Sequence, residues 1–185
     1  MFDMRVLRDA HMPTHVLAAR QSDHSGHPTI LPINLGQFEQ AFRVDLNVSP
    51  PPPGSTAPVP RMDEETQNLV VSLPVVHIAV PHVDSLPLLL LYAMKLETDL
   101  GLLAHHLLPV QVVAEFPSLP AMLHYLCLFG DLDFERLFRF NQGIRNNTLV
   151  LLPTNEELNT VIGNAWHATA EARRARQRQW ALPQI

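Results

Sequence analysis

Residues Ser85–Met94 read SLPLLLLYAM, and Ser118–Cys127 repeat much of this pattern as SLPAMLHYLC. In each copy a serine precedes a Leu-Pro pair, which suits a first helical turn because the N–H that proline lacks would have no partner there. Apolar residues then recur at i, i+3 and i+4, the spacing of one helical face. Both stretches predict amphipathic helices. A duplication at a period of 33 would require matching flanks, and these barely match.

Helical spacing also covers three further stretches. Residues 99–108 carry leucines on one face and stop before Pro109, and residues 131–144 carry an aromatic stripe. The segment from Thr154 has the spacing of a capping box, in which Thr154 and Glu157 each satisfy the other's backbone N–H. Its apolar face continues beyond this start, so a long helix is expected here.

Two short apolar stretches precede these helices. Leu69–Leu73 and Val75–Val80 are rich in valine, and each is followed by a proline. β-branched residues between proline breaks are typical of brief strands. One or two short strands are therefore expected ahead of the helical region.

Residues 1–66 differ in composition from the rest. Six of the 17 prolines lie in residues 50–60. Proline fixes φ and donates no backbone hydrogen bond, so this segment is expected to be an extended linker, or to dock on an aromatic groove of a partner. The region before it has mixed spacing and is expected to be weakly ordered or to fold on a partner.

The expected fold is therefore mainly α. It is a compact helical bundle with one or two short strands over residues 67–179, preceded by a poorly ordered region 1–66 that contains the Pro-rich linker 50–60, and followed by a tail, 180–185. A BTB-like α/β fold is the alternative, because a short strand followed by an SLPxLLxY-type helix is similar to that interaction fold.

Composition excludes several classes of protein. The chain has 185 residues, of which 46% are hydrophobic, and a net charge of -5, so it can bury one core and carries no strong field toward nucleic acid or anionic lipid. The single Cys127 excludes an intrachain disulfide and a cysteine zinc cluster. No apolar run approaches the roughly 20 residues that cross a bilayer. A soluble, intracellular protein of the nucleus or cytoplasm, with no membrane partner, is expected.

No motif of a known catalytic or cofactor site is present. The chain has no HExxH, no GxxxxGK[ST], no GxGxxG and no GxSxG, so no catalytic residue, cofactor or metal ligand is assigned and no enzymatic activity is expected. The pairs His11/His15 and His24/His27 have spacings that would let two imidazoles share a metal. A His-based metal-dependent enzyme stays an alternative, although no third ligand stands out.

The C-terminal segment is basic. Residues 168–185 hold four arginines and one acidic residue, Glu171; the arginines are Arg173, Arg174, Arg176 and Arg178. Such a cluster can contact phosphates, which predicts a nucleic-acid-binding regulator, or act as a nuclear-import signal. Cations at a helix C-terminus also offset the macrodipole. Both interpretations stay open.

Residues 140–147 read FNQGIRNN, with five amides or glycines in eight positions. Such residues suit a helix exit, with Gly143 or Asn146 in a left-handed conformation. They also suit a surface that receives the backbone of a partner.

Several of these stretches together resemble one family. PHVDSLPLLLLYAMKLETDLGLLAHHLLP, EFPSLPAMLHYL, FNQGIRNN and AWHATAEARR are similar to the shared region of the clampless-type (clampless-one-like) developmental proteins of mushroom-forming and related basidiomycete fungi. The resemblance runs from Pro81 to Arg174, and the combination of LETDL, FNQG and W-x-x-T-A-E-A-R is its most specific part. Residues 1–66 show no such likeness.

The resemblance implies a non-enzymatic regulator of mating and sexual development. It implies an adaptor that acts in clamp connection formation and dikaryon maintenance through protein–protein interaction, with transcription or cell-cycle regulators as candidate partners. It carries over no catalytic residue. The matched positions expected to interact are Phe140, Asn141, Gln142, Gly143, Trp166, Glu171 and Arg173.

Overall fold

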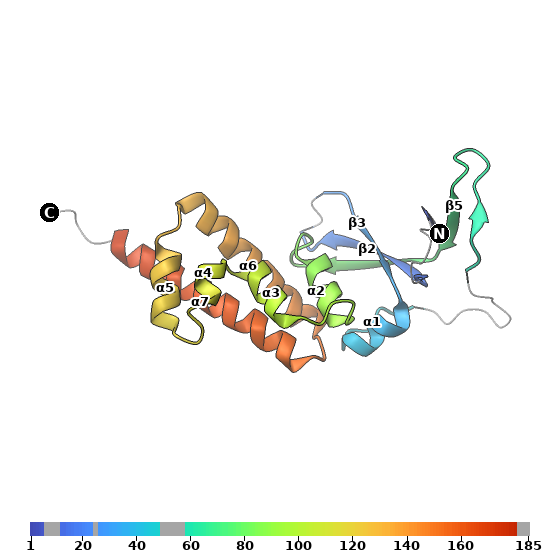
Figure 1. Cartoon of the computed structure of the whole chain (residues 1–185). Helices are drawn as coiled ribbons and strands as arrows, with labels where there is room; N and C mark the ends of the chain where they lie inside the picture. Colours follow the sequence, from blue (N-terminus) through green and yellow to red (C-terminus); the bar gives the residue numbers. More distant parts are fainter. Residues whose placement is uncertain (6–11, 24–25, 49–57, 181–185) are drawn as a thin grey trace.

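The computed structural model describes residues 1–5, 12–23, 26–48 and 58–180. Within these residues the chain forms a mixed α/β structure of seven helices and two three-stranded sheets. Figure 1 shows the strands at one end of the molecule, near the N-terminus, and the long helices at the other. The expectation of a mainly α bundle with one or two strands is therefore wrong. Most of the expected linker 50–60, and the tail after residue 180, lie outside the described residues.

The larger sheet, which has the longer strands, has the order β3-β2-β6. Its central strand, β2, comes from the region that was expected to be poorly ordered. Strand β2 (His15–Gln21) pairs antiparallel with β3 (Thr29–Ile33) and parallel with β6 (Val75–Val80). A strand enclosed on both faces carries a continuous apolar run instead of alternating, and the four residues Val16–Ala19 are all buried. The pairing of β2 with β6 builds the N-terminal region into the sheet, which corrects that expectation.

The second sheet continues from the first through one proline. It has the order β1 (Phe2–Arg5), β5 (Leu69–Leu73), β4 (Arg61–Met62), and only Pro74 separates β5 from β6. Proline donates no ladder hydrogen bond, so it suits the point where the chain changes sheets. Its carbonyl still accepts from the N–H of Val16 at 2.9 Å. The strands predicted at 69–73 and 75–80 are confirmed.

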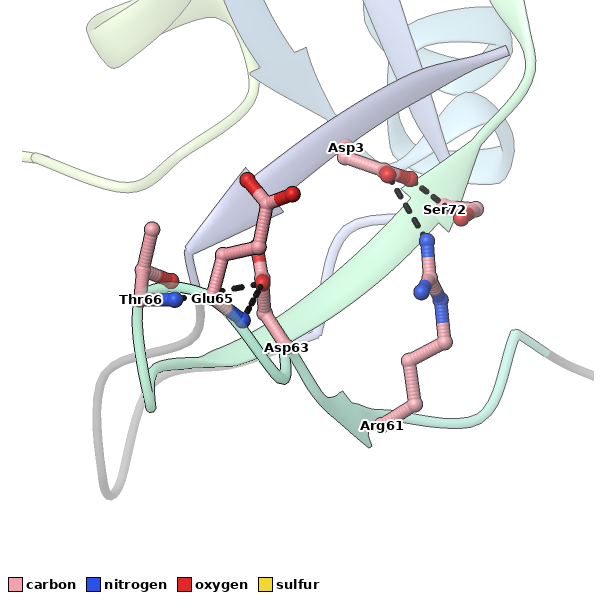
Figure 2. A network of polar contacts seen from close by, with 6 residues as sticks. All are labelled: Asp3, Arg61, Asp63, Glu65, Thr66 and Ser72. Atoms are coloured by element: carbon pink, nitrogen blue, oxygen red, sulfur yellow. Dashed lines mark hydrogen bonds and ion pairs between the residues drawn. The ribbon is translucent and has the colours of Figure 1, made fainter.

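Polar contacts hold the outer strands of the second sheet together. The Asp3 carboxylate accepts from Arg61 at 2.7 Å and from the Ser72 hydroxyl, so it joins β1 to β4 and β5 (Figure 2). In the turn after β4, the carboxylate of Asp63 accepts from the N–H groups of Glu65 and Thr66 at 2.9 and 3.3 Å. The N–H of Glu65, and to a smaller extent that of Thr66, lowers the pKa of Asp63 because each hydrogen bond stabilises the charged carboxylate.

The helices follow one another with short connections. Four short helices come from the predicted apolar stretches or their flanks, and their bounds are α2 (Leu86–Ala93), α3 (Leu100–Leu107), α4 (Val110–Val113) and α5 (Leu119–Cys127). Two long helices, α6 (Asp131–Leu151) and α7 (Glu156–Trp180), pack against each other. Helix α7 also packs against α3 and α5, and α6 packs against α2 and α3. No helix of the described residues combines the length and the apolar character needed to cross a membrane.

The turn between α6 and α7 is attached to the N-terminal region. Helix α1 (Leu35–Ala41) ends against this turn, where the N–H of Thr154 donates to the carbonyl of Ala41 at 2.8 Å. The Thr154 hydroxyl also donates to the carbonyls of Gln40 and Ala41. Thr154 is therefore not the cap of α7; the Asn155 side chain takes this role and accepts from the N–H of Leu158 at 3.1 Å. The predicted capping box is wrong.

One hydrophobic core joins the larger sheet to all seven helices. Its fully buried members include Leu17 from β2, Phe38 from α1, Leu89 from α2 and Ile162 from α7. Tyr92 is also buried there, and its hydroxyl has no hydrogen-bond partner within the described residues. Burial raises the pKa of Tyr92, with the charges of Glu97 and Asp99 adding to the shift. The sheet and the helices thus share their interior.

Candidate protein-binding groove

The FNQG residues lie within α6 and not at its exit. The helix continues to Leu151, and the left-handed residue that ends it is Leu152, at φ 53°. The expected exit at Gly143 or Asn146 is therefore wrong. Asn141 is fully buried, and its amide donates to the carbonyls of Leu107 at 2.8 Å and Leu137 at 3.0 Å.

The other three residues of this motif divide between the interior and the surface. Phe140 is half-buried and meets the His82 ring edge-on at 6.1 Å between centroids. Gly143 is buried against the same ring. Gln142 alone of the four is exposed. Phe140, Asn141 and Gly143 therefore serve to pack α6, and the Asn141 amide nitrogen, which was expected to be available for a partner, is used within the chain.

Two amide side chains bind the connection between β6 and α2. Asn147 on α6 accepts from the N–H of His82 at 3.0 Å and donates to the carbonyl of the same residue at 2.6 Å. From the other side, Gln21 donates to the carbonyl of Pro81 at 2.6 Å and accepts from the N–H of Val83 at 3.1 Å. Each amide occupies both a donor and an acceptor of the loop, so the loop is fixed between the sheet and α6.

The same loop holds a serine beside a histidine. Ser85 Oγ lies 2.9 Å from His82 Nδ1 and accepts from the Asn147 amide at 3.2 Å. A serine hydroxyl next to an imidazole has the distance of an activated nucleophile. Ser85 is fully buried, however, so a substrate has no access to its hydroxyl. The hydrogen-bonded set of His82, Ser85 and Asn147 links the loop to α6. The Ser85 side chain makes no cap hydrogen bond to α2.

The four C-terminal arginines differ in how many contacts they make within the chain. Arg176 donates to the carbonyls of Leu126, Cys127 and Phe129 at 3.3, 3.2 and 2.7 Å, and forms an ion pair with Asp131. Its guanidinium also lies 4.6 Å from the centre of the Phe134 ring, and its side chain is only 12% exposed. Arg176 therefore satisfies the carbonyls at the end of α5 and joins them to the start of α6.

The other residues of α7 that were expected to bind a partner also contact residues of the chain itself. Arg173 lies over the Phe138 ring at 4.2 Å and pairs with Glu135 at 3.4 Å, and Trp166 packs on Phe138 at 5.3 Å between centroids. Arg174 pairs with Glu171. Arg178 is exposed and donates to the carbonyl of Arg174 at 3.3 Å. Arg174 and Arg178 are the two exposed arginines of the four, and nucleic-acid binding by the cluster stays a prediction.

The histidine pairs fall only partly within the described residues, since His11 and His24 lie outside them. Among the described residues, no three His, Cys, Asp or Glu side chains converge as a metal site. His15 is half-buried, its Nδ1 lies 3.0 Å from the Thr14 hydroxyl, and burial lowers its pKa against the opposing charge of Glu39. The metal-dependent alternative stays a prediction.

An apolar groove opens between four helices, and the sequence did not predict it. It has a volume of about 290 Å³, and its walls come from α3, α4, α5 and α7 and the connections between them. The lining residues are Ala104, Leu108, Val113, Phe116, Met122, Val161, Asn164 and Ala165. Small side chains at Ala104 and Ala165 leave space where α3 and α7 pack, and Phe116 at the rim is 60% exposed.

The residues of this groove gave only a weak sequence signal. Phe116 stands before Pro117 in a short connection, where an aromatic residue indicates neither a core position nor a binding position. Ala104 and Ala165 fall on apolar helix faces that predict a packed core. The groove exists because these positions meet in space, and helical spacing along the chain does not contain that information.

No protein-family model, no curated protein and no solved structure matches this chain. Neither the fungal family that the sequence resembles nor the BTB-like alternative gains support from a known relative.

Proposed function

We propose that this chain is a non-enzymatic regulatory adaptor that binds a partner protein through the groove between α3, α4, α5 and α7. The observation that supports this most directly is an open apolar hollow of about 290 Å³ with Phe116 60% exposed at its rim. Large exposed apolar residues beside an apolar depression are typical of interaction sites. Binding hot spots are aromatic or aliphatic side chains that fill such depressions.

The lining favours a protein partner over a small polar ligand. Seven of its eight residues are apolar, and Asn164 is the only polar one. Small-molecule sites usually combine an apolar wall with several placed polar groups that fix the orientation of the ligand. A partner protein supplies its own orientation through contacts around the rim, so it needs few polar groups inside the groove.

The proposed biological role is the regulation of sexual development in a basidiomycete fungus, from the nucleus or the cytoplasm. It rests on the resemblance over residues 81–174 to the clampless-type proteins. All eight groove residues lie within this stretch. The adaptor would act in clamp connection formation and dikaryon maintenance.

A complementation experiment tests both parts of the proposal. The gene is deleted in a strain that can mate, and hyphal septa and nuclear pairing are inspected after return of the wild-type chain, Phe116→Asp or Leu149→Asp. Leu149 on α6 is 57% exposed and lies outside the groove lining, so it is a matched control for Phe116. Wild type and Leu149→Asp are expected to restore clamp connections, and Phe116→Asp is expected to fail.

Two results would contradict the proposal, each in a different part. Normal clamp connections in the deletion strain would remove the developmental role. Full restoration by Phe116→Asp, with the variant present at wild-type abundance, would remove the groove as the functional site.

A further inference from the structure

Two acidic segments of the chain form the groove. All eight lining residues belong to residues 96–127 and 153–172. These two segments contain no lysine or arginine and six acidic residues, which are Glu97, Asp99, Glu115, Glu156, Glu157 and Glu171. The whole chain has a net charge of only -5, so negative charge is concentrated in the segments that form the groove.

Some of these carboxylates already have partners. Glu97 and Asp99 accept backbone N–H groups at the start of α3, and Glu171 pairs with Arg174. Glu115 and Glu157 form no ion pair with any residue that the structure describes. Glu115 directly precedes Phe116, and Glu157 lies one helical turn before Val161, on the same face of α7. Both therefore stand beside groove residues with charge that a partner can neutralise.

We infer that the groove binds a basic amphipathic helix, with apolar residues at i, i+3 and i+4 and lysine or arginine on the flanks of that face. This inference rests on the proposed function and names the chemistry of its partner. A helix is favoured because the groove is lined by apolar side chains, with Asn164 the only polar one, and none of the lining residues belongs to a strand edge. An extended peptide would need a strand edge to satisfy its backbone, whereas a helix satisfies its own.

The charges favour a basic partner over an acidic one. Opposite charge accelerates encounter and like charge costs binding free energy, and both effects weaken as salt screens them beyond about 8 Å at physiological ionic strength. The apolar contacts inside the groove are not screened. Binding should therefore divide into a salt-sensitive part from the carboxylates and a salt-insensitive part from residues such as Phe116.

Peptide titration of the full chain tests this division. Three labelled helical peptides of about 15 residues share one leucine face and carry lysine, glutamine or glutamate on its flanks. Fluorescence anisotropy at about 20 mM and about 500 mM NaCl gives their dissociation constants. The lysine peptide is expected to bind at least about tenfold more tightly than the glutamate peptide at low salt, and to lose most of this advantage at high salt.

Variants separate the two contributions. Phe116→Ser is expected to weaken binding of the lysine peptide about tenfold or more at both salt concentrations, because an apolar anchor is lost. Glu115→Gln/Glu157→Gln is expected to weaken it several-fold at low salt only. Glu64→Gln/Glu65→Gln makes the same change of charge on the exposed turn after β4, and binding should stay within about twofold of wild type. Circular dichroism confirms that each variant is folded.

Several results would overturn the inference. These are equal binding of the lysine and glutamate peptides, no effect of Phe116→Ser, or equal effects of the two glutamine pairs. Self-association in sedimentation velocity that Phe116→Ser abolishes would instead identify a second copy of the chain as the occupant. If no peptide binds while Phe116→Asp still fails to restore clamp connections, the partner chemistry is wrong and the proposed function stands.

Discussion

The imidazole of His82 lies directly against the backbone of Gly143: a β-carbon placed on Gly143 would stand 2.3 Å from Cγ and 2.4 Å from Nδ1 of the ring. Side-chain carbons do not approach ring atoms so closely, so only glycine leaves room for this contact. The ring is also restrained, because Nδ1 lies 2.9 Å from Ser85 Oγ and the ring meets Phe140 edge-on. Gly143 therefore allows the connection from β6 to α2 to lie on α6.

Gly143→Ala is expected to lower the free energy of unfolding by about 1–3 kcal/mol, because overpacking forces the ring or α6 to move. Gly163→Ala on α7 is the matched control. Its added β-carbon would meet no atom within 4 Å, and alanine is the better helix former by roughly 0.5–1 kcal/mol. Urea unfolding followed by circular dichroism measures both. Equal stability of the two variants would show that the His82 ring has room to move.

Asn147→Asp is expected to destabilise the protein by about 1–3 kcal/mol or more. The substitution removes the donors to the His82 carbonyl and to Ser85 Oγ, and it places a carboxylate at a fully buried position. Asn146→Asp, at the exposed neighbouring position, is expected to change stability by less than about 0.5 kcal/mol. Chemical unfolding of both variants checks this, and similar losses for the two would contradict a role for the Asn147 amide.

Arg176→Lys is expected to lower stability by about 1–3 kcal/mol although it keeps the charge. Lysine lacks the planar fork that reaches three carbonyls and Asp131 at once. Arg178→Lys is the control, because Arg178 is exposed and its hydrogen bond within the described residues goes to a single carbonyl, that of Arg174. Thermal unfolding distinguishes the two. If Arg178→Lys proves the more damaging substitution, the assignment of Arg176 to the end of α5 is wrong.

Tyr92→Phe is expected to leave stability unchanged or to raise it by about 1 kcal/mol. The hydroxyl of Tyr92 is buried without a hydrogen-bond partner within the described residues, so its removal relieves an unsatisfied polar group. Tyr125 occupies the same position in the second SLP stretch, but it is 36% exposed. Tyr125→Phe is therefore the control, with little expected change. A clear loss of stability in Tyr92→Phe would show that this hydroxyl forms a hydrogen bond in solution.

The stability of the chain is expected to depend on pH through His15. Burial holds the folded-state pKa of His15 below its ordinary value of 6.5, so between these two pKa values the unfolded chain binds more protons. The contribution to the free energy of unfolding is complete above pH 6.5 and is lost as the pH falls through this window. His15→Gln should flatten the dependence.

A second substitution tests the sign of this effect. Glu39 raises the pKa of His15 against the effect of burial. Glu39→Gln should therefore lower that pKa further and deepen the loss of stability on acidification. His167→Gln, at an exposed position of α7, is the control. Urea unfolding between about pH 5 and about pH 8 measures these slopes, and identical slopes for wild type and His15→Gln would exclude His15 as the cause.

The helices and strands that were predicted well are those with local signals. Proline bounds β5 and β6, and the apolar spacing after each SLP marks α2 and α5. The features that were mispredicted depend on distant partners. Strand β2 reads as mixed sequence until β6, whose paired residues lie 59 positions later in the chain, pairs with it. Thr154 has the spacing of a helix cap, but its hydroxyl bonds to the end of α1 instead.

The candidate functional residues likewise include some that the sequence marked and some that it did not. Residues 140–147 stood out by composition, and α6 uses their amides at Asn141 and Asn147 to bind backbone groups of other elements. Amides in a helix often signal its end, because they compete for backbone hydrogen bonds. Here the side chains of Asn141 and Asn147 bond to groups outside α6, so neither ends the helix. The groove around Phe116 carried no comparable signal.

By itself, the sequence determined the local elements, because proline positions and apolar spacing act over a few residues of the chain. Only the tertiary structure decided which strands pair, which amides and arginines are used internally, and that Ala104 and Ala165 line one hollow. The physical reason is that pairing, burial and open space depend on atoms from separate segments that meet in the folded chain.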